Sequence, residues 1–155
     1  MMQLTLFLTI IAAGAAAQSA PSGILFVCEH GSAKSVIAAG HFNRLAAARK
    51  LPVRAFGRGI DPDAEIPAII RIGMLADGLD VSGLKPETVT LREIQNARRV
   101  ITLGCELPAS KSVAAAKLEQ WNDIPPVGSG YEAARRAIVE HIDQLLKSLA
   151  GRTAP

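Results

Sequence analysis

The stretch best suited to chemistry is CEHGSAKS, residues 28–35, which combines a nucleophile, small residues and a cation. A loop that leads into a helix aims successive backbone N–H groups at one point, where an anion can bind. Gly31 tolerates positive φ and lets the backbone approach a ligand closely. The helix N-terminus favours the thiolate form of Cys28, and Ser35 is placed to hydrogen-bond that thiolate. The stretch therefore predicts an anion-binding loop that carries its own nucleophile.

Two elements must position this loop, a strand before it and a helix after it. Residues 23–28, GILFVC, form a continuous apolar run typical of buried parallel strands. Residues 35–50, SVIAAGHFNRLAAARK, carry apolar positions on one side of a helix, which Pro52 ends. The alternative for Cys28 is a buried, inert cysteine at a strand end, and C-x5-K-S alone also occurs by chance. The strand–loop–helix context favours the reactive cysteine.

Further strands and helices alternate along the rest of the chain. The expected strands are 53–57, the apolar part of 98–105, and 118–121. The expected helices are 66–76, 90–97 and 131–149. This alternation predicts parallel βαβ units in a three-layer α/β domain. Ligands of such sheets bind at the carboxyl ends of the strands, where Cys28 and Cys105 would both lie.

Composition limits the classes of protein to be considered. The chain has 155 residues, 49% hydrophobic and 20% charged, which fits one folded domain and argues against disorder. The net charge is +3, and the basic residues are scattered without interleaved aromatic residues. No nucleic-acid partner is therefore expected, whereas a preference for small anionic ligands stays open.

The N-terminal residues have the anatomy of a signal peptide. Residues 4–13 form an apolar run shorter than the ~20 residues of a membrane span, and Ala15–Ala17 supply small residues for cleavage. No basic residue precedes the run, which leaves open an uncleaved anchor or a wrongly assigned start. The predicted organisation is a signal peptide 1–17, a linker 18–22, one domain 23–150 and a tail 151–155. We expect a periplasmic or secreted protein that is not membrane-attached after cleavage.

Several segments in order resemble the low-molecular-weight protein tyrosine phosphatase family, which includes the thioredoxin-type arsenate reductases. ILFVCEHGSAKSVIAAGHFNRLA is similar to that family's first strand, C-x5-R-S loop and first helix. RAFGRGIDPDAEIPAIIRIGMLADGLDVSGLKPETVT, ARRVITLGC and WNDIPPVGSGYEAARRAIVEHIDQLL are similar to its later segments. The resemblance covers residues 23–149. It implies a central four-stranded parallel sheet with helices on both faces.

The resemblance also implies hydrolysis of phosphate monoesters, including phosphotyrosine, through a cysteinyl-phosphate on Cys28 without a metal or other cofactor. The implied oxyanion-binding residues are Glu29, His30, Gly31, Ser32, Ala33, Lys34 and Ser35. Lys34 replaces the family's arginine and offers a point charge where arginine offers a planar fork. Pro125–Pro126 occupies the position of the family's Asp-Pro acid, which leaves Asp123 as the candidate general acid. Both departures weaken the case for rapid phosphoryl transfer.

Two alternatives remain. In the arsenate reductase branch the thiolate attacks arsenate and further thiols resolve the adduct, with an external thiol as reductant. Cys105 is then the candidate redox thiol, although GCELPAS lacks the second cysteine of that branch. The other alternative is a non-catalytic oxyanion-binding or regulatory module.

Other polar residues near the loop have simpler interpretations. We expect Glu29 and His30 to face solvent, because a loop of this kind binds through its backbone. An isolated His–Glu pair does not predict a metal site. The acidic residues of 61–65 are expected to be solvated, Trp121 to lie in the core, and Tyr131 is a weaker candidate for substrate contact.

Overall fold

The computed structural model describes residues 23–108, 111 and 114–151. The predicted signal peptide, the linker and residues 152–155 of the tail lie outside this part of the chain. In order, the elements are β1 (Ile24–Cys28), α1 (Lys34–Ala48), β2 (Ala55–Gly59), α2 (Ala68–Ala76), α3 (Leu91–Asn96), β3 (Arg99–Thr102), the 3₁₀ turn η2 (Ala115–Lys117), β4 (Leu118–Gln120), the 3₁₀ turn η3 (Val127–Ser129) and α4 (Tyr131–Ala150). None of the helices described is both long and apolar enough to span a membrane.

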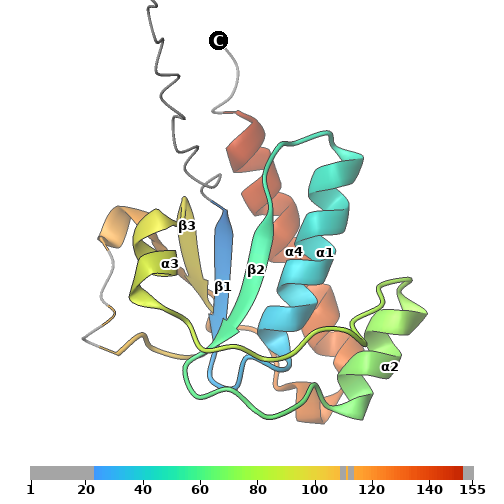
Figure 1. Ribbon diagram of the computed structural model, residues 1–155. Coiled ribbons are helices and arrows are strands. Elements are labelled where there is room, and N and C mark those ends of the chain that lie inside the picture. The colour runs from blue at the N-terminus through green and yellow to red at the C-terminus, as the bar shows by residue number, and fades with distance from the viewer. Residues whose placement is uncertain (1–22, 109–110, 112–113, 152–155) are drawn as a thin grey trace, which may run out of the picture.

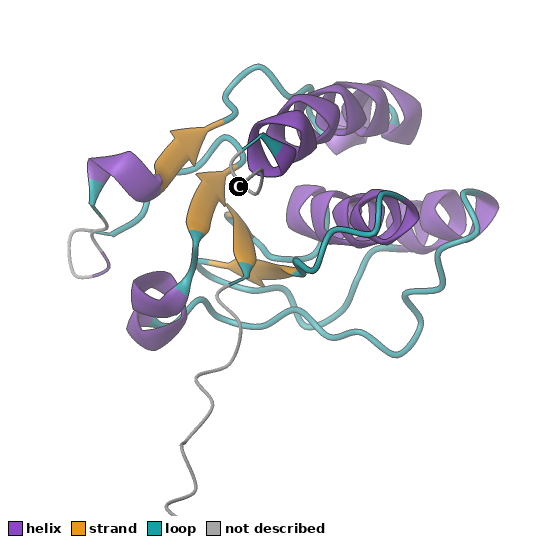
Figure 2. Ribbon diagram, turned by 90° about the horizontal axis from the view of Figure 1, so that it is seen from above, coloured by secondary structure: helices purple, strands orange, loops and turns teal. Residues whose placement is uncertain are grey.

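The four strands form one parallel sheet in the order β2-β1-β3-β4. Helices α1 and α4 cover one face of the sheet and α3 covers the other (Figure 1). Seen from above, α1 and α4 run alongside each other (Figure 2). The predicted three-layer fold with a four-stranded parallel sheet is therefore confirmed, and the central strand β1 carries Cys28 to the carboxyl edge.

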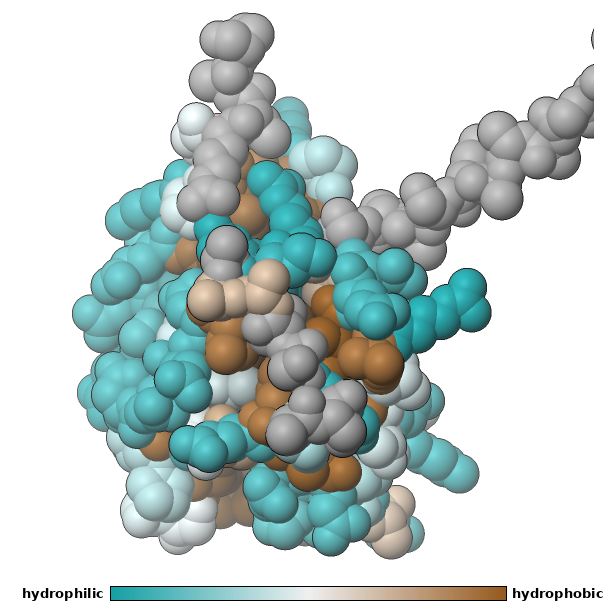
Figure 3. Space-filling model, turned by 90° about the vertical axis from the view of Figure 1, so that its left-hand side faces the viewer, coloured by the Kyte–Doolittle hydropathy of each residue, from teal (hydrophilic) through white to brown (hydrophobic). Residues whose placement is uncertain are grey.

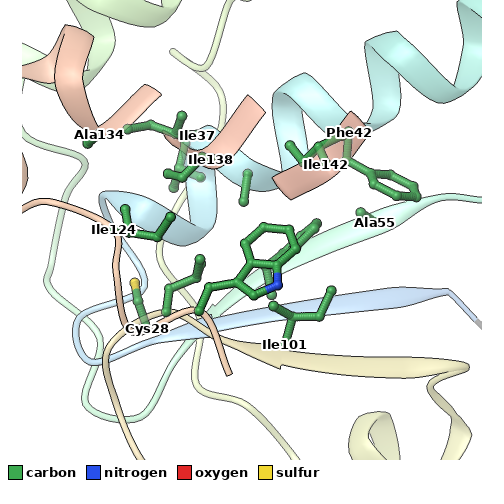
Figure 4. Packing of buried hydrophobic residues seen from close by; sticks show 14 of the residues in the cluster. Cys28, Ile37, Phe42, Ala55, Ile101, Ile124, Ala134, Ile138 and Ile142 are labelled. Atoms are coloured by element: carbon green, nitrogen blue, oxygen red, sulfur yellow. The ribbon is translucent and has the colours of Figure 1, made fainter. Parts of the chain in front are cut away.

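Two hydrophobic clusters fill the spaces between the sheet and the helices on its two faces. The larger lies between the sheet and α1, α2 and α4, where the ring of Phe26 is 5.9 Å from that of Phe42 and 5.4 Å from that of Trp121. Trp121 is 1% exposed and belongs to the core, as predicted. Cys28 lies at one edge of this cluster (Figure 4). The smaller cluster, on the α3 side of the sheet, consists of Leu25, Val27, Val89, Ile94, Ala97, Val100 and Cys105.

The side of the molecule that carries α3 also presents apolar groups to the surface. Figure 3 shows hydrophobic side chains gathered among polar ones on this side.

Helix α3 starts with the predicted capping box, in which Thr90 N donates to Glu93 Oε2 at 2.9 Å and Glu93 N donates to Thr90 Oγ1 at 3.2 Å. These two bonds satisfy donors that the first turn of a helix leaves free.

Strand β2 begins and ends two residues later than the predicted strand 53–57. It pairs with β1 along the whole of that strand. A Cβ on Gly57 would lie 2.7 Å from Ser35 O, and one on Gly59 would lie 2.7 Å from Gly31 N. By composition, these glycines indicate a loop after residue 57. In the structure they belong to β2, and their lack of a side chain lets the end of this strand pack directly against the backbone of the anion-binding loop.

Candidate oxyanion site

The loop between β1 and α1 has the geometry expected of an anion site. Gly31 adopts φ of 61°, a conformation that favours glycine, and the side chains of Ser32 and Ser35 are buried. The thiol of Cys28 donates to Ser35 Oγ at 3.2 Å. Helix α1 begins at Lys34, so the positive end of its dipole faces the loop.

Hydrogen bonds fix this loop through its carbonyl groups. From the segment after β2, Asp61 N donates to Glu29 O at 2.9 Å and Asp63 N donates to His30 O at 3.0 Å. The backbone N–H groups of residues 31–35, by contrast, have no acceptor among the described residues. Since buried backbone donors are almost always paired, these N–H groups form a cradle suited to an oxyanion.

The ammonium group of Lys34 lies close to the segments that follow β3 and β4. Its Nζ donates to Ile124 O at 3.0 Å. A Cβ on Gly104, which has φ of 71°, would lie 3.4 Å from this Nζ, so the glycine leaves room for the cation. An ammonium has three N–H donors, and two remain for a bound anion.

A pocket of about 470 Å³ opens at the loop. Its polar side is formed by Cys28, Glu29, His30, Ser32, Ala33, Lys34 and Asp63. The apolar groups around it are Pro67, Ile69 and Ile70 at α2, Leu103 after β3, and Pro126 and Val127 at η3. A smaller pocket of about 250 Å³ beside α3 has no cysteine among its described lining residues, and its Thr90 and Glu93 are engaged in the capping box of α3.

Asp63 belongs to the site, although the sequence suggested a solvated acidic loop. Its Oδ2 accepts a hydrogen bond from Ser32 Oγ at 2.5 Å, and its side chain is 44% exposed. The side chain of His30 is 61% exposed, in agreement with the expectation that it faces solvent. It also lines the pocket, which the sequence did not indicate. The signal for Asp63 was topological, because loops that follow adjacent parallel strands meet at the same edge of the sheet.

Asp123, the predicted general acid, lies outside the residues that line this pocket. The carboxylate is 69% exposed and accepts from His141 Nε2 at 2.9 Å. This hydrogen bond holds the pKa of the Asp123 carboxyl below its usual value. A carboxyl group that is kept ionised and turned to His141 is poorly placed to protonate a leaving group, and the segment instead contributes Pro126 and Val127 to the pocket.

Cys105 lies in the smaller cluster, on the other face of the sheet from the cluster that includes Cys28. Its thiol donates to Val27 O at 3.4 Å, and both cysteines are free rather than disulfide-bonded. Burial raises the pKa of the Cys105 thiol to about 11. At neutral pH this residue is therefore a protonated thiol rather than a reactive thiolate.

Helix α2, which forms part of the pocket, is held by a buried polar network at its C-terminal end. Asp77 Oδ2 accepts from the Tyr131 hydroxyl at 2.6 Å and lies 3.2 Å from His41 Nε2. The ring of Tyr131 lies 2.6 Å from the position that a Cβ on Gly73 would take. Tyr131 thus anchors α2 to α4 instead of lining the pocket.

This network predicts a pH-dependent stability. Burial, together with the nearby Arg44 cation, lowers the pKa of His41 from 6.5. The unfolded chain therefore binds more protons at His41, and the free energy of unfolding falls as the pH drops below 6.5. We expect the Tm to decrease from about pH 7 to about pH 5, and to decrease less in His41→Gln, which does not titrate. Circular dichroism melts test this, and equal pH dependence in both proteins would refute it.

Within the described residues, no group of three or more His, Cys, Asp or Glu side chains is arranged to hold a metal ion.

Known structures share this fold. YfkJ from Bacillus subtilis is 18% identical with a TM-score of 0.73, covering 88% of this chain and 99% of that one. The thioredoxin-dependent arsenate reductase Cg_ArsC1' of Corynebacterium glutamicum is 23% identical with a TM-score of 0.72, covering 88% and 65%. The low molecular weight protein tyrosine phosphatase from T. tengcongensis is 17% identical with a TM-score of 0.69, covering 82% and 99%.

No family model and no curated protein matches the sequence. The structural similarities show that the chain has the fold of low-molecular-weight protein tyrosine phosphatases and arsenate reductases, as the sequence resemblance implied.

Proposed function

We propose that the protein hydrolyses phosphate monoesters at the pocket of Cys28, through a cysteinyl-phosphate intermediate. The observation that supports this most strongly is the set of backbone N–H groups of residues 31–35, which have no described acceptor and lie next to the thiol. Together with the N-terminus of α1 and the Lys34 ammonium, these donors suit a phosphoryl group with charge spread over three oxygens.

In the proposed reaction, the Cys28 thiolate attacks phosphorus, the S–P bond forms, and the bond to the ester oxygen breaks. The Ser35 hydroxyl, 3.2 Å from Sγ, rotates to donate a hydrogen bond to the thiolate, which keeps its negative charge for the attack. Water then loses a proton and attacks the phosphocysteine, which releases inorganic phosphate and regenerates the Cys28 thiolate. The backbone cradle holds the same oxygens in both steps.

The surroundings of the cradle favour an uncharged, apolar ester group. Pro67, Ile69 and Ile70 bring apolar surface to the pocket, and Lys34 is the only basic side chain besides His30 among the described residues that line it. Glu29 and Asp63 disfavour a second anionic group on the substrate. Aryl phosphates, including phosphotyrosine, are the class that we propose.

Anion binding by the loop is the first test of this function. A Cβ on Gly31 would lie 2.7 Å from Gly59 N, in a backbone conformation that side chains rarely adopt, so Gly31→Ala distorts the cradle. We expect the wild type to bind inorganic phosphate in the millimolar range at low salt, and Gly31→Ala to bind it at least ~10-fold more weakly. The matched control is Gly83→Ala, because nothing lies within 4 Å of a Cβ there.

Isothermal titration calorimetry measures these affinities. Absence of phosphate binding by the wild type would remove the basis of the anion site. Equal affinities in the wild type and Gly31→Ala would show that phosphate binds elsewhere on the molecule.

One observation favours a second candidate, a non-catalytic oxyanion-binding module. Asp123 pairs with His141 and is absent from the pocket, so the predicted acid is missing where a leaving group would depart. Such a module would bind phosphate with the same dependence on Gly31 and would not turn over aryl phosphates.

Export is a separate part of the proposal. It rests on the apolar run 4–13 and on the small residues Ala15–Ala17, which lie outside the described part of the chain. We propose that the domain acts in the periplasm or outside the cell, where its substrates would be extracytoplasmic phosphate esters.

A further inference from the structure

Departure of a basic ester oxygen requires a proton donor in the pocket, and the described pocket residues limit the choice. The titratable side chains among them are Cys28, Glu29, His30, Lys34 and Asp63. In the proposed reaction Cys28 is the nucleophile, and Lys34, bonded to the Ile124 carbonyl, is the cation of the cradle. The donor must therefore be found among the remaining three.

Of the three, His30 has a side chain that is held through one ring nitrogen while its other ring nitrogen stays available to donate a proton. Its Nδ1 lies 3.4 Å from Asp61 O and 3.8 Å from Asp63 Oδ1. These two acceptors orient the imidazole through Nδ1, whereas Nε2 has no partner among the described residues. This arrangement, with one ring nitrogen held by acceptors and the other free, is the one in which histidine serves as a general acid.

Asp63 connects this imidazole to the anion-binding loop. One carboxylate oxygen, Oδ2, accepts from Ser32 Oγ at 2.5 Å, and the other, Oδ1, faces His30. Its backbone N–H also donates to His30 O at 3.0 Å. Asp63 Oδ2 is thus hydrogen-bonded and Oδ1 faces the imidazole at ion-pair distance, while no described group fixes the carboxylate of Glu29, so His30 is the better donor.

We infer that His30, positioned by Asp63, protonates the leaving oxygen in place of the acid that residues 123–126 do not supply; this inference rests on the proposed phosphatase function. As Cys28 Sγ bonds to phosphorus, the electron pair of the breaking P–O bond goes to the ester oxygen. That oxygen takes the proton from Nε2 of the imidazolium. In the second step neutral His30 accepts a proton from the water that attacks the S–P bond, which restores the imidazolium.

The charged groups around His30 come from the two loops that meet there. They are Glu29 and Lys34 from the part of the chain that carries His30, and the carboxylate of Asp63 on the segment after β2, where Asp61 contributes only its backbone carbonyl.

The test compares two substrates that differ in their need for a proton. Nitrophenolate leaves without protonation, whereas the more basic phenolate needs it. In single-turnover measurements we expect His30→Gln to lower the rate of phenol release from phenyl phosphate by ~10²–10⁴-fold, and the rate with 4-nitrophenyl phosphate by less than ~10-fold. Added imidazole should restore phenol release to His30→Ala. Because the His30 side chain is 61% exposed, neither substitution removes core packing.

Asp123→Asn is the rival variant. A loss confined to phenyl phosphate in Asp123→Asn, or equal losses on both substrates in His30→Gln, would overturn the assignment of His30 and leave the proposed function standing. Failure of imidazole to restore His30→Ala would also overturn it. A wild-type protein that releases neither phenol nor nitrophenol would overturn the proposed function together with this inference.

Discussion

Replacement of Cys28 by serine should lower the hydrolysis of 4-nitrophenyl phosphate by at least ~10³-fold, because a covalent mechanism depends on its nucleophile. Serine keeps the size of the side chain and its contact with Ser35, 3.2 Å away in the wild type. It is far less nucleophilic than a thiolate held at a helix N-terminus. The variant should therefore still bind phosphate in the calorimeter while its turnover is lost.

The matched control is the other cysteine. Cys105→Ala removes a thiol whose pKa is raised to about 11 and which packs on the opposite face of the sheet. We expect phosphatase activity within a few-fold of the wild type, with a lower Tm from the small cavity. Comparable loss of turnover in both cysteine variants would contradict the proposed mechanism. Thiol-dependent reduction of arsenate, lost in both variants, would favour the reductase alternative instead.

Lys34 should show the second large effect. Lys34→Met removes the only ammonium of the pocket among the described residues, and we expect turnover to fall ~10²–10³-fold, as when one transition-state donor is lost. Lys34→Arg should raise turnover by up to ~10²-fold, because a guanidinium contacts two oxyanion atoms at once. Lys34 Nζ lies 3.0 Å from Ile124 O, an acceptor that a guanidinium N–H can also use, and Gly104 places no Cβ beside it.

Steady-state kinetics with 4-nitrophenyl phosphate measures both Lys34 variants, with Lys111→Met, at a half-buried position outside the pocket, as the control. A fall in activity for Lys34→Arg would show that the bond to the Ile124 carbonyl fixes the cation in a way arginine does not reproduce. Unchanged activity in Lys34→Met would exclude this cation from the reaction.

Local chemistry in the sequence was enough to predict the loop and most of the elements. The run GILFVC gave β1, the capping box of Thr90 and Glu93 gave the start of α3, and the apolar periodicity of 131–149 gave α4 almost to the residue. Each of these signals involves residues close together in the chain. The site loop was found for the same reason.

Residues whose roles depend on distant partners were not predictable in this way. Asp123 was expected near Cys28, but its carboxylate pairs with His141 on α4, eighteen positions along the chain. Asp63 is exposed, as expected of a solvated loop, but strand order also brings its carboxylate to Ser32. The sequence showed both cysteines at strand ends, whereas only the structure shows that they belong to clusters on opposite faces of the sheet.

The most direct test of the account is detection of the covalent intermediate. The protein is mixed with 4-nitrophenyl phosphate, quenched in acid during turnover, and digested for mass spectrometry. The mechanism predicts a phosphoryl adduct on the peptide that contains Cys28, absent from Cys28→Ser and present in Cys105→Ala. Turnover without such an adduct, or an adduct on another residue, would contradict the central claim that Cys28 is the nucleophile of a phosphatase.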